Sequence, residues 1–204
     1  GIMVIYDITK EIFSTKAYPG DPVPEKKSWL SMEKGDVCNL TSLTVGSHSG
    51  THIDAPKHFI ANGKSVAEMP LEKCVGICQV VSHSGKLEGE FWKNKVCEIT
   101  DKLLIRGNAS LDVKAAETIV ACGIHLVGVE APTVGDSSCQ QQVHKILLEN
   151  EVVILENLCL DGIQEGQYFL AAQPLKMQGV DGSPVRALLM DKDAFLNLDY
   201  FKEK

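Results

Sequence analysis

One short stretch of the chain concentrates side chains that can bind metal ions. Residues 44–59, TVGSHSGTHIDAPKHF, contain His48, His52, Asp54 and His58, all at even positions. A helix would bring two histidines four residues apart to one face, but Gly50 disfavours a helix and Asp54 would point away from the pair. In an extended chain, side chains alternate between two faces. The spacing therefore predicts a strand that carries both imidazoles and the carboxylate on one face.

These residue types indicate a particular kind of site. Two imidazoles and one carboxylate suit zinc or manganese, and three protein ligands leave coordination positions open, as in catalytic metal sites. Gly46 and Gly50 leave space on this face for an ion or a substrate. Pro56 ends the strand and turns the chain, so we expect His58 to return to the rim of the same pocket. The alternative is a strand whose outward polar residues share one register by coincidence.

Strand-like and helix-like patterns alternate along the rest of the chain. Strand-like runs occur at residues 3–9, 42–54 and 76–81, and apolar runs of buried-strand length occur at 124–130 and 151–158. Helical patterns that begin near capping residues and end at Gly or Asn cover 111–123 and 137–150. This order predicts an α/β fold whose sheet is mixed, because many strands precede the first helix. With no internal repeat and no long linker, we expect residues 1–204 to form a single domain.

Composition excludes several classes of protein. The net charge of −7 and the lack of a basic run argue against a nucleic-acid partner. No apolar run approaches the roughly 20 residues needed to cross a bilayer, and the N-terminal residues do not resemble a signal peptide. The seven cysteines are odd in number and include no CxxC pair, so they are expected to be reduced thiols. A cytoplasmic location is therefore expected, without a membrane partner.

Five motifs together resemble one enzyme family. HSGTHIDAPKHF (48–59) is similar to the HxGTHxDxPxHF signature of the cyclase-like metal hydrolases, which include bacterial kynurenine formamidase and isatin hydrolase. Further blocks resemble the family in the same order, at residues 18–22, 128–136, 144–160 and 174–188. The resemblance implies mixed β-sheets flanked by helices, in a single domain of the swivelling β/β/α type. It also implies a homodimer or a larger homo-oligomer.

The resemblance also implies a two-metal site. His48, His52 and Asp54 would hold the first ion, and Asp54, His144 and Glu156 the second, with Glu156 bridging; two Zn²⁺ per chain are expected, or alternatively one Mn²⁺. From the residues alone, Glu156 interrupts an apolar strand, where an unpaired buried carboxylate would be costly and a cation would remove that cost. His144 on its own could equally be a partly buried helix histidine.

The remaining implications concern catalysis and the substrate. His58 matches the family's acid/base histidine, which would protonate the departing nitrogen, and its ordinary pKa near 6.5 suits that role. Tyr18 stands before PGD, where formamidases commonly have Trp, and its ring could stack on an aryl substrate. Glu130 replaces a usual Asp, so the turn after it is expected to differ. His83 and His125 match no family position.

Three functions follow from these observations. The first is a metal-dependent arylformamidase that hydrolyses N-formyl-L-kynurenine, a small-molecule amide. The second keeps the metal site but acts on a cyclic amide or imide such as isatin. The third is a non-catalytic metal-binding protein on the same fold, which the intact motif disfavours because a degenerate relative should have lost some of these positions.

Overall fold

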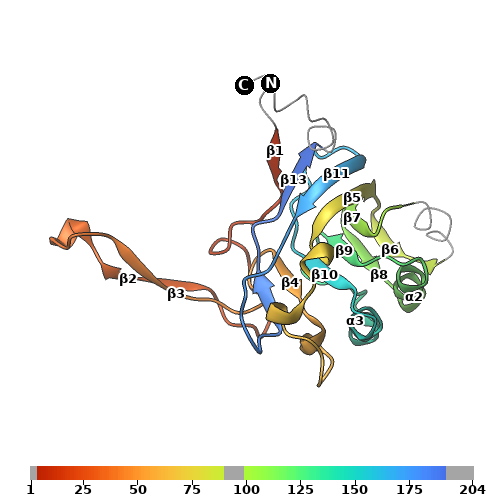
Figure 1. Ribbon diagram of the computed structural model, residues 1–204, viewed down its shortest axis with the longest axis horizontal. Coiled ribbons are helices and arrows are strands. Elements are labelled where there is room, and N and C mark those ends of the chain that lie inside the picture. The colour runs from red at the N-terminus through yellow and green to blue at the C-terminus, as the bar shows by residue number, and fades with distance from the viewer. Residues whose placement is uncertain (1–3, 90–98, 192–204) are drawn as a thin grey trace.

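A computed structural model describes residues 4–89 and 99–191 of the protein (Figure 1). Its strands are β1 Ile5–Asp7, β2 Glu25–Leu30, β3 Leu40–Thr44, β4 His52–Asp54, β5 Val75–Ser82, β6 Gly85–Leu87, β7 Lys102–Arg106, β8 Ala109–Leu111, β9 Leu126–Val129, β10 Val153–Glu156, β11 Gly166–Ala171, β12 Gly182–Pro184 and β13 Leu188–Asp191. The α-helices are α2 Val113–Ala121 and α3 Gln140–Glu149. Short 3₁₀ helices cover Met32–Lys34, Pro56–His58, Val66–Glu68 and Leu71–Lys73.

Nine strands form one mixed sheet in the order β1-β13-β11-β5-β7-β9-β10-β4-β12. The central strands β5, β7, β9 and β10 pair in parallel, and the strands on both sides of them pair antiparallel. The expected α/β fold with a mixed sheet is confirmed. Within the described residues no helix is long and apolar enough to cross a membrane.

Apolar side chains cover both faces of this sheet. Along β7, Leu104 contributes to one hydrophobic cluster, whereas Leu103 and Ile105 contribute to the other, as the two-residue period of a strand requires. Helices α2 and α3 lie against the second face (Figure 1) and supply that cluster with apolar residues such as Ile119 and Leu147. Both helices were expected from the sequence, and Asp112 caps the N-terminus of α2, where its carboxylate accepts the Ala115 N–H.

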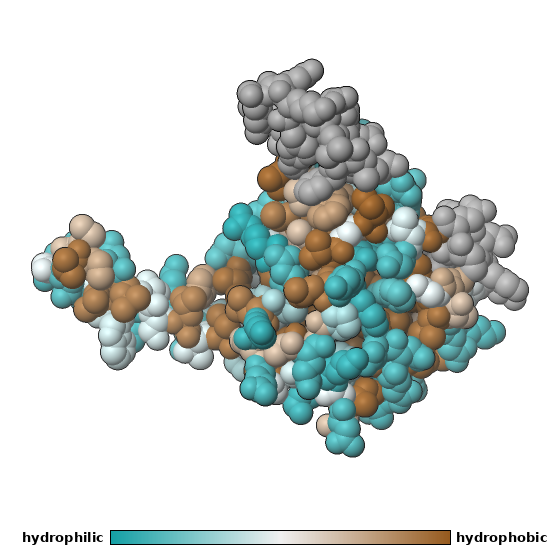
Figure 2. Space-filling view, viewed as in Figure 1, coloured by the Kyte–Doolittle hydropathy of each residue, from teal (hydrophilic) through white to brown (hydrophobic). Residues whose placement is uncertain are grey.

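Strands β2 and β3 form a hairpin that extends away from the sheet as an arm (Figure 1). Almost every residue of the two strands is exposed. Figure 2 shows brown, apolar residues along this arm, and Trp29 and Leu43 are 67% and 60% exposed. A two-stranded ribbon alone in water is only marginally stable, so the arm lacks the packing that the rest of the chain provides for itself.

Candidate metal centre

The pairing of β4 with β10 brings the ligand candidates together. His52 lies opposite Glu156, and Asp54 lies opposite Ile154. Directly opposite residues share a face of an antiparallel pair, so His52, Asp54 and Glu156 all project toward the side on which α3 packs. His144 reaches this face from α3, and all four of these polar side chains are buried.

His48 joins this group by a route that differs from the prediction. The prediction of one continuous strand over 42–54 is wrong. Strand β3 ends at Thr44, β4 begins at His52, and a turn connects them. Gly50 in this turn has φ +60°, the left-handed conformation that glycine adopts most easily. The turn still aims the His48 ring at Asp54, with Nδ1 2.9 Å from Oδ1.

Two groups of three side chains share Asp54. In the first, His52 Nε2 lies 3.3 Å from the same Asp54 Oδ1 that His48 contacts. In the second, His144 Nε2 lies 3.4 Å from Asp54 Oδ2 and 3.3 Å from Glu156 Oε2. His52 Nε2 is also 3.0 Å from Glu156 Oε1, so Glu156 connects the two groups. In each group the ligand atoms are close enough to surround one ion.

Backbone carbonyls fix which ring nitrogen faces the carboxylates. His52 Nδ1 lies 2.8 Å from the Gly50 carbonyl oxygen, and His144 Nδ1 lies 2.8 Å from that of Gln140. A carbonyl only accepts, so each Nδ1 carries a proton and donates it. In the neutral imidazoles each Nε2 then offers a lone pair toward carboxylate oxygens, which also only accept. Lone pairs of the imidazoles and of the carboxylates thus face one another, which suits a cation between them. Metal-binding histidines commonly donate their other ring nitrogen to a backbone carbonyl, as both of these do.

Electrostatics of the metal-free site lead to the same conclusion. Burial alone would lower the pKa of His52 and of His144, but hydrogen bonds and charge interactions with Asp54 and Glu156 raise each to about 10. Burial opposes ionisation of Asp54, yet the surrounding imidazoles hold its pKa well below the usual range. Asp54 Oδ2 is nevertheless buried and, among the described residues, has no hydrogen-bond partner. Protons thus take the place that divalent cations would fill, and the donor set fits such ions.

Zinc binding should therefore release protons. At pH 7 the metal-free protein keeps His52 and His144 protonated, because their pKa of about 10 lies above that pH. A metal ion binds the neutral ring, so at least about two protons per chain should leave, and the apparent affinity should rise with pH. Calorimetric titration in two buffers of different ionisation enthalpy measures this release. Equal heats in both buffers would contradict it.

A pocket of about 240 Å³ opens above the ligand groups. His58 lies on its wall, 30% exposed, and its ring stacks on that of His48 with centroids 3.9 Å apart. Burial lowers the pKa of His58, so its ring is neutral at pH 7. Tyr18 lines the same pocket, and its hydroxyl is 3.3 Å from Gln140 Oε1 on α3. The structure thus places the residues predicted for the site around one cavity, except Asp54, which is fully buried and contacts His48, His52 and His144.

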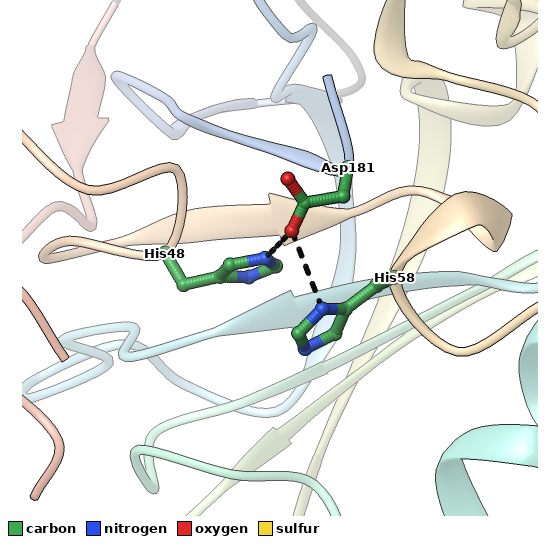
Figure 3. A group of neighbouring side chains, drawn as sticks. All are labelled: His48, His58 and Asp181. Carbon is green, nitrogen blue, oxygen red and sulfur yellow. Dashed lines mark hydrogen bonds and ion pairs between the residues drawn. The ribbon is translucent and has the colours of Figure 1, made fainter. Parts of the chain in front are cut away.

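Some residues of this site were assigned no role from the sequence, although they lie in blocks that resemble the family. Asp181, just before β12, lies 2.6 Å from His48 Nε2 and 3.4 Å from His58 Nδ1 (Figure 3). Gly182 follows it, and a Cβ there would be only 2.5 Å from the His48 ring, so glycine leaves the room that this ring occupies. Phe59 stacks on His144 with centroids 4.7 Å apart. An Asp-Gly pair is typical of any turn, which is why the sequence alone does not assign it to the site.

Glu130 has a structural role. Its carboxylate accepts the N–H of Gly107 at 2.6 Å and that of Leu160 at 2.7 Å. It thereby connects the ends of β9 and β7 with the chain after β10. The expectation that the turn after Glu130 departs from the family stays a prediction.

Comparisons with known proteins agree with this geometry. The Cyclase family model matches residues 6–103. Kynurenine formamidase of Bacillus thuringiensis subsp. konkukian is 36% identical over 84% of this chain and 90% of its own length. A structure described as a predicted metal-dependent hydrolase from Bacillus stearothermophilus superposes with a TM-score of 0.80 at 26% identity, over 94% of this chain and all of that one.

Isatin hydrolase A from Ralstonia solanacearum shares the fold, with a TM-score of 0.80 at 20% identity over 93% of this chain and 92% of that one. The sequence resemblance noted above is thus confirmed over most of the chain by the formamidase relative, and over the whole fold by the solved structures. The chain belongs to the cyclase family.

Proposed function

We propose that the protein is a metal-dependent amidohydrolase that converts N-formyl-L-kynurenine and water to kynurenine and formate. The observation that carries this proposal is the pair of ligand groups sharing Asp54 at the floor of a pocket, with a neutral histidine on the wall. The kynurenine formamidase relatives support the choice of substrate.

In this proposal His48, His52 and Asp54 hold one zinc ion, and Asp54, His144 and Glu156 hold the other. Bound zinc would polarise the carbonyl of the substrate and lower the pKa of a bound water molecule. The backbone hydrogen bonds to His52 and His144 keep these rings in the orientation that metal binding needs. One Mn²⁺ in place of two Zn²⁺ remains the alternative.

His58 moves the protons of the reaction. Hydrolysis of a formamide joins the oxygen of water to the formyl carbon, breaks the C–N bond and gives the amine nitrogen a proton. A neutral His58 accepts a proton from water and then donates it to that nitrogen, which leaves as the arylamine. Its place on the pocket wall, stacked on His48, puts it beside the space that the substrate would enter.

Tyr18→Ala should separate substrate recognition from chemistry. Loss of a ring that stacks on an aryl group should reduce kcat/KM for N-formylkynurenine by about two- to tenfold, the range that an aromatic pair contributes. Turnover of a small non-aromatic formamide should change much less, because the metal ligands and His58 remain. Tyr18→Trp should be tolerated, and Tyr18→Phe tests the hydroxyl contact with Gln140 separately. Equal losses on both substrates would make Tyr18 a structural residue.

The proposed function is tested by assaying zinc-loaded and manganese-loaded protein on N-formylkynurenine and on isatin. Turnover of N-formylkynurenine well above that of isatin supports the formamidase. Preference for isatin supports the second function, which the shared fold with isatin hydrolase A keeps open. Tight metal binding without turnover of either would indicate the non-catalytic alternative.

We also propose that the chain assembles as a homodimer or a larger homo-oligomer through the β2–β3 arm. The arm exposes apolar side chains, with Met32 at 60% and Val37 at 91% exposure. Residues 23–45 contain three basic and three acidic side chains, so they lack the net negative charge that would repel a second copy of a chain with net charge −7. A second copy is therefore the partner that we assign to this arm.

Trp29→Glu should dissociate this assembly. Trp29 is 67% exposed on the arm, and a charge there would have to be buried in the interface. Sedimentation velocity at about 10 µM should show a dimer or larger species for the wild type and mainly monomer for the variant. Leu175→Glu, which puts the same charge on a 62% exposed apolar residue outside the arm, is the control. A monomeric wild type would contradict the proposal.

The single domain over residues 1–204 and the cytoplasmic location also stay proposals. Five cysteines in the described part of the chain, Cys38, Cys74, Cys78, Cys139 and Cys159, are free thiols, which suits a reducing compartment.

A further inference from the structure

Asp181 has an unusual position among the residues around the pocket. Its carboxylate Oδ2 contacts His48 Nε2 at 2.6 Å and His58 Nδ1 at 3.4 Å, so one oxygen faces both a proposed metal ligand and the proposed acid/base (Figure 3). Nothing in the sequence assigned it a role.

The contact with His48 completes a pattern that the other two histidines establish. His52 and His144 each donate their second ring nitrogen to a backbone carbonyl, which no substitution removes. His48 instead has Asp181 at Nε2 and Asp54 at Nδ1. A carboxylate that accepts the Nε2–H leaves the Nδ1 lone pair directed at Asp54, where the first ion would lie. Of the three proposed histidine ligands, His48 alone is thus oriented by a side chain.

The contact with His58 has a second consequence. The 3.4 Å separation is an ion-pair contact in which Nδ1 faces the carboxylate, so the nitrogen left to exchange a proton with substrate is Nε2. The stacking of the two rings, 28° from parallel, presents both of their nitrogens to the same carboxylate. Asp181 is itself held firmly, because its carbonyl accepts the Ala55 N–H at 2.9 Å and Ser47 Oγ lies 3.3 Å from its Oδ1.

We infer that Asp181 is a positioning residue that orients His48 for metal binding and His58 for proton transfer through Nε2. The inference rests on the proposed function, because His58 transfers a proton only if the chain is a hydrolase. It makes metal affinity and catalysis depend on one carboxylate that belongs to neither proposed ligand group.

Asp181→Ala tests this inference, with Asp181→Asn as the conservative variant. For Asp181→Ala, zinc affinity measured against a chromophoric chelator should fall about 10- to 100-fold, the usual effect of losing such a partner. The kcat for N-formylkynurenine at saturating zinc should also fall, with KM little changed. Asp181→Asn keeps an acceptor oxygen and should recover part of both, and Asp161→Ala, which removes an exposed carboxylate elsewhere, serves as control.

Nitrogen NMR of histidine-labelled, zinc-loaded protein at pH 8 gives a readout that needs no substrate. The wild type should show His58 protonated at Nδ1, and Asp181→Ala should lose this preference. Unchanged zinc affinity together with an unchanged His58 tautomer would overturn the inference. Reduced zinc affinity with wild-type tautomer and kcat would also overturn it, because the two histidines would then not be coupled. These two measurements stand even if the wild type proves inactive on N-formylkynurenine, so failure of the proposed function is distinguished from failure of this inference.

Discussion

Asp54→Asn should abolish both metal sites at once and reduce hydrolysis by a factor on the order of 10⁴ or more, as expected when a group on which a whole catalytic unit depends is removed. Asp54 Oδ1 faces His48 and His52, and Oδ2 faces His144. Asparagine keeps the shape but offers one acceptor oxygen and no charge, so it cannot serve both ligand groups.

Elemental analysis and thermal unfolding test this expectation. The wild type should contain two zinc ions per chain, and zinc at about 100 times its Kd should stabilise it by about 2.7 kcal/mol for each site. Asp54→Asn should contain few or no zinc ions and show no zinc-dependent shift in Tm, whereas the exposed Asp161→Asn should behave as wild type. One ion in the wild type would favour the mononuclear alternative, and two ions in Asp54→Asn would mean that Asp54 is not shared.

The sequence allowed the ligand set to be proposed but not its geometry. Alternation along residues 42–54 suggested one continuous strand, and the structure has a turn there, because Gly50 adopts a left-handed conformation. His52 and Asp54 do share a face, since β4 is extended. His48 reaches the Asp54 carboxylate by a different path, one that depends on Gly182 leaving space for its ring. Local spacing cannot reveal such a tertiary contact.

A charged residue within an apolar strand predicted the site more reliably than the alternation along residues 42–54. Glu156 at the end of an apolar strand indicated a paired carboxylate, and the structure buries it beside His52 and His144. His144 could not be separated from an ordinary helix histidine, because its partner lies on a strand that pairs with β10 only in the folded chain. Asp181 was assigned no role for the same reason, because its contacts with His48 and His58 form only in the folded chain.

The arm shows another limit of the sequence. Composition does not tell whether a strand packs on the chain's own core or stays exposed, as β2 and β3 do. The mixed sheet could be predicted because it depends on strand and helix order. The protruding hairpin could not, since it depends on what the chain leaves uncovered.

His58→Ala should reduce kcat by a factor of about 10² to 10⁴, the usual contribution of a positioned general acid or base, while zinc content stays at the wild-type level. His58 belongs to neither group that shares Asp54, and the lowered pKa that burial gives it keeps the ring neutral and able to accept a proton. The predicted loss is one of chemistry, so KM should change little.

The structure also makes the opposite outcome specific. His58 lies close enough to His48 and Asp181 for these three side chains to form a group of their own around an ion. If His58→Ala loses zinc in parallel with activity, His58 is a ligand, and the proton must come from another group. His125→Ala is the matched control, because its side chain is 50% exposed beside Asp101 and should affect neither zinc content nor kcat. Retained zinc with a large loss of kcat would therefore place His58 in proton transfer, because the metal centre would be intact and only the group that exchanges protons with the substrate would be missing.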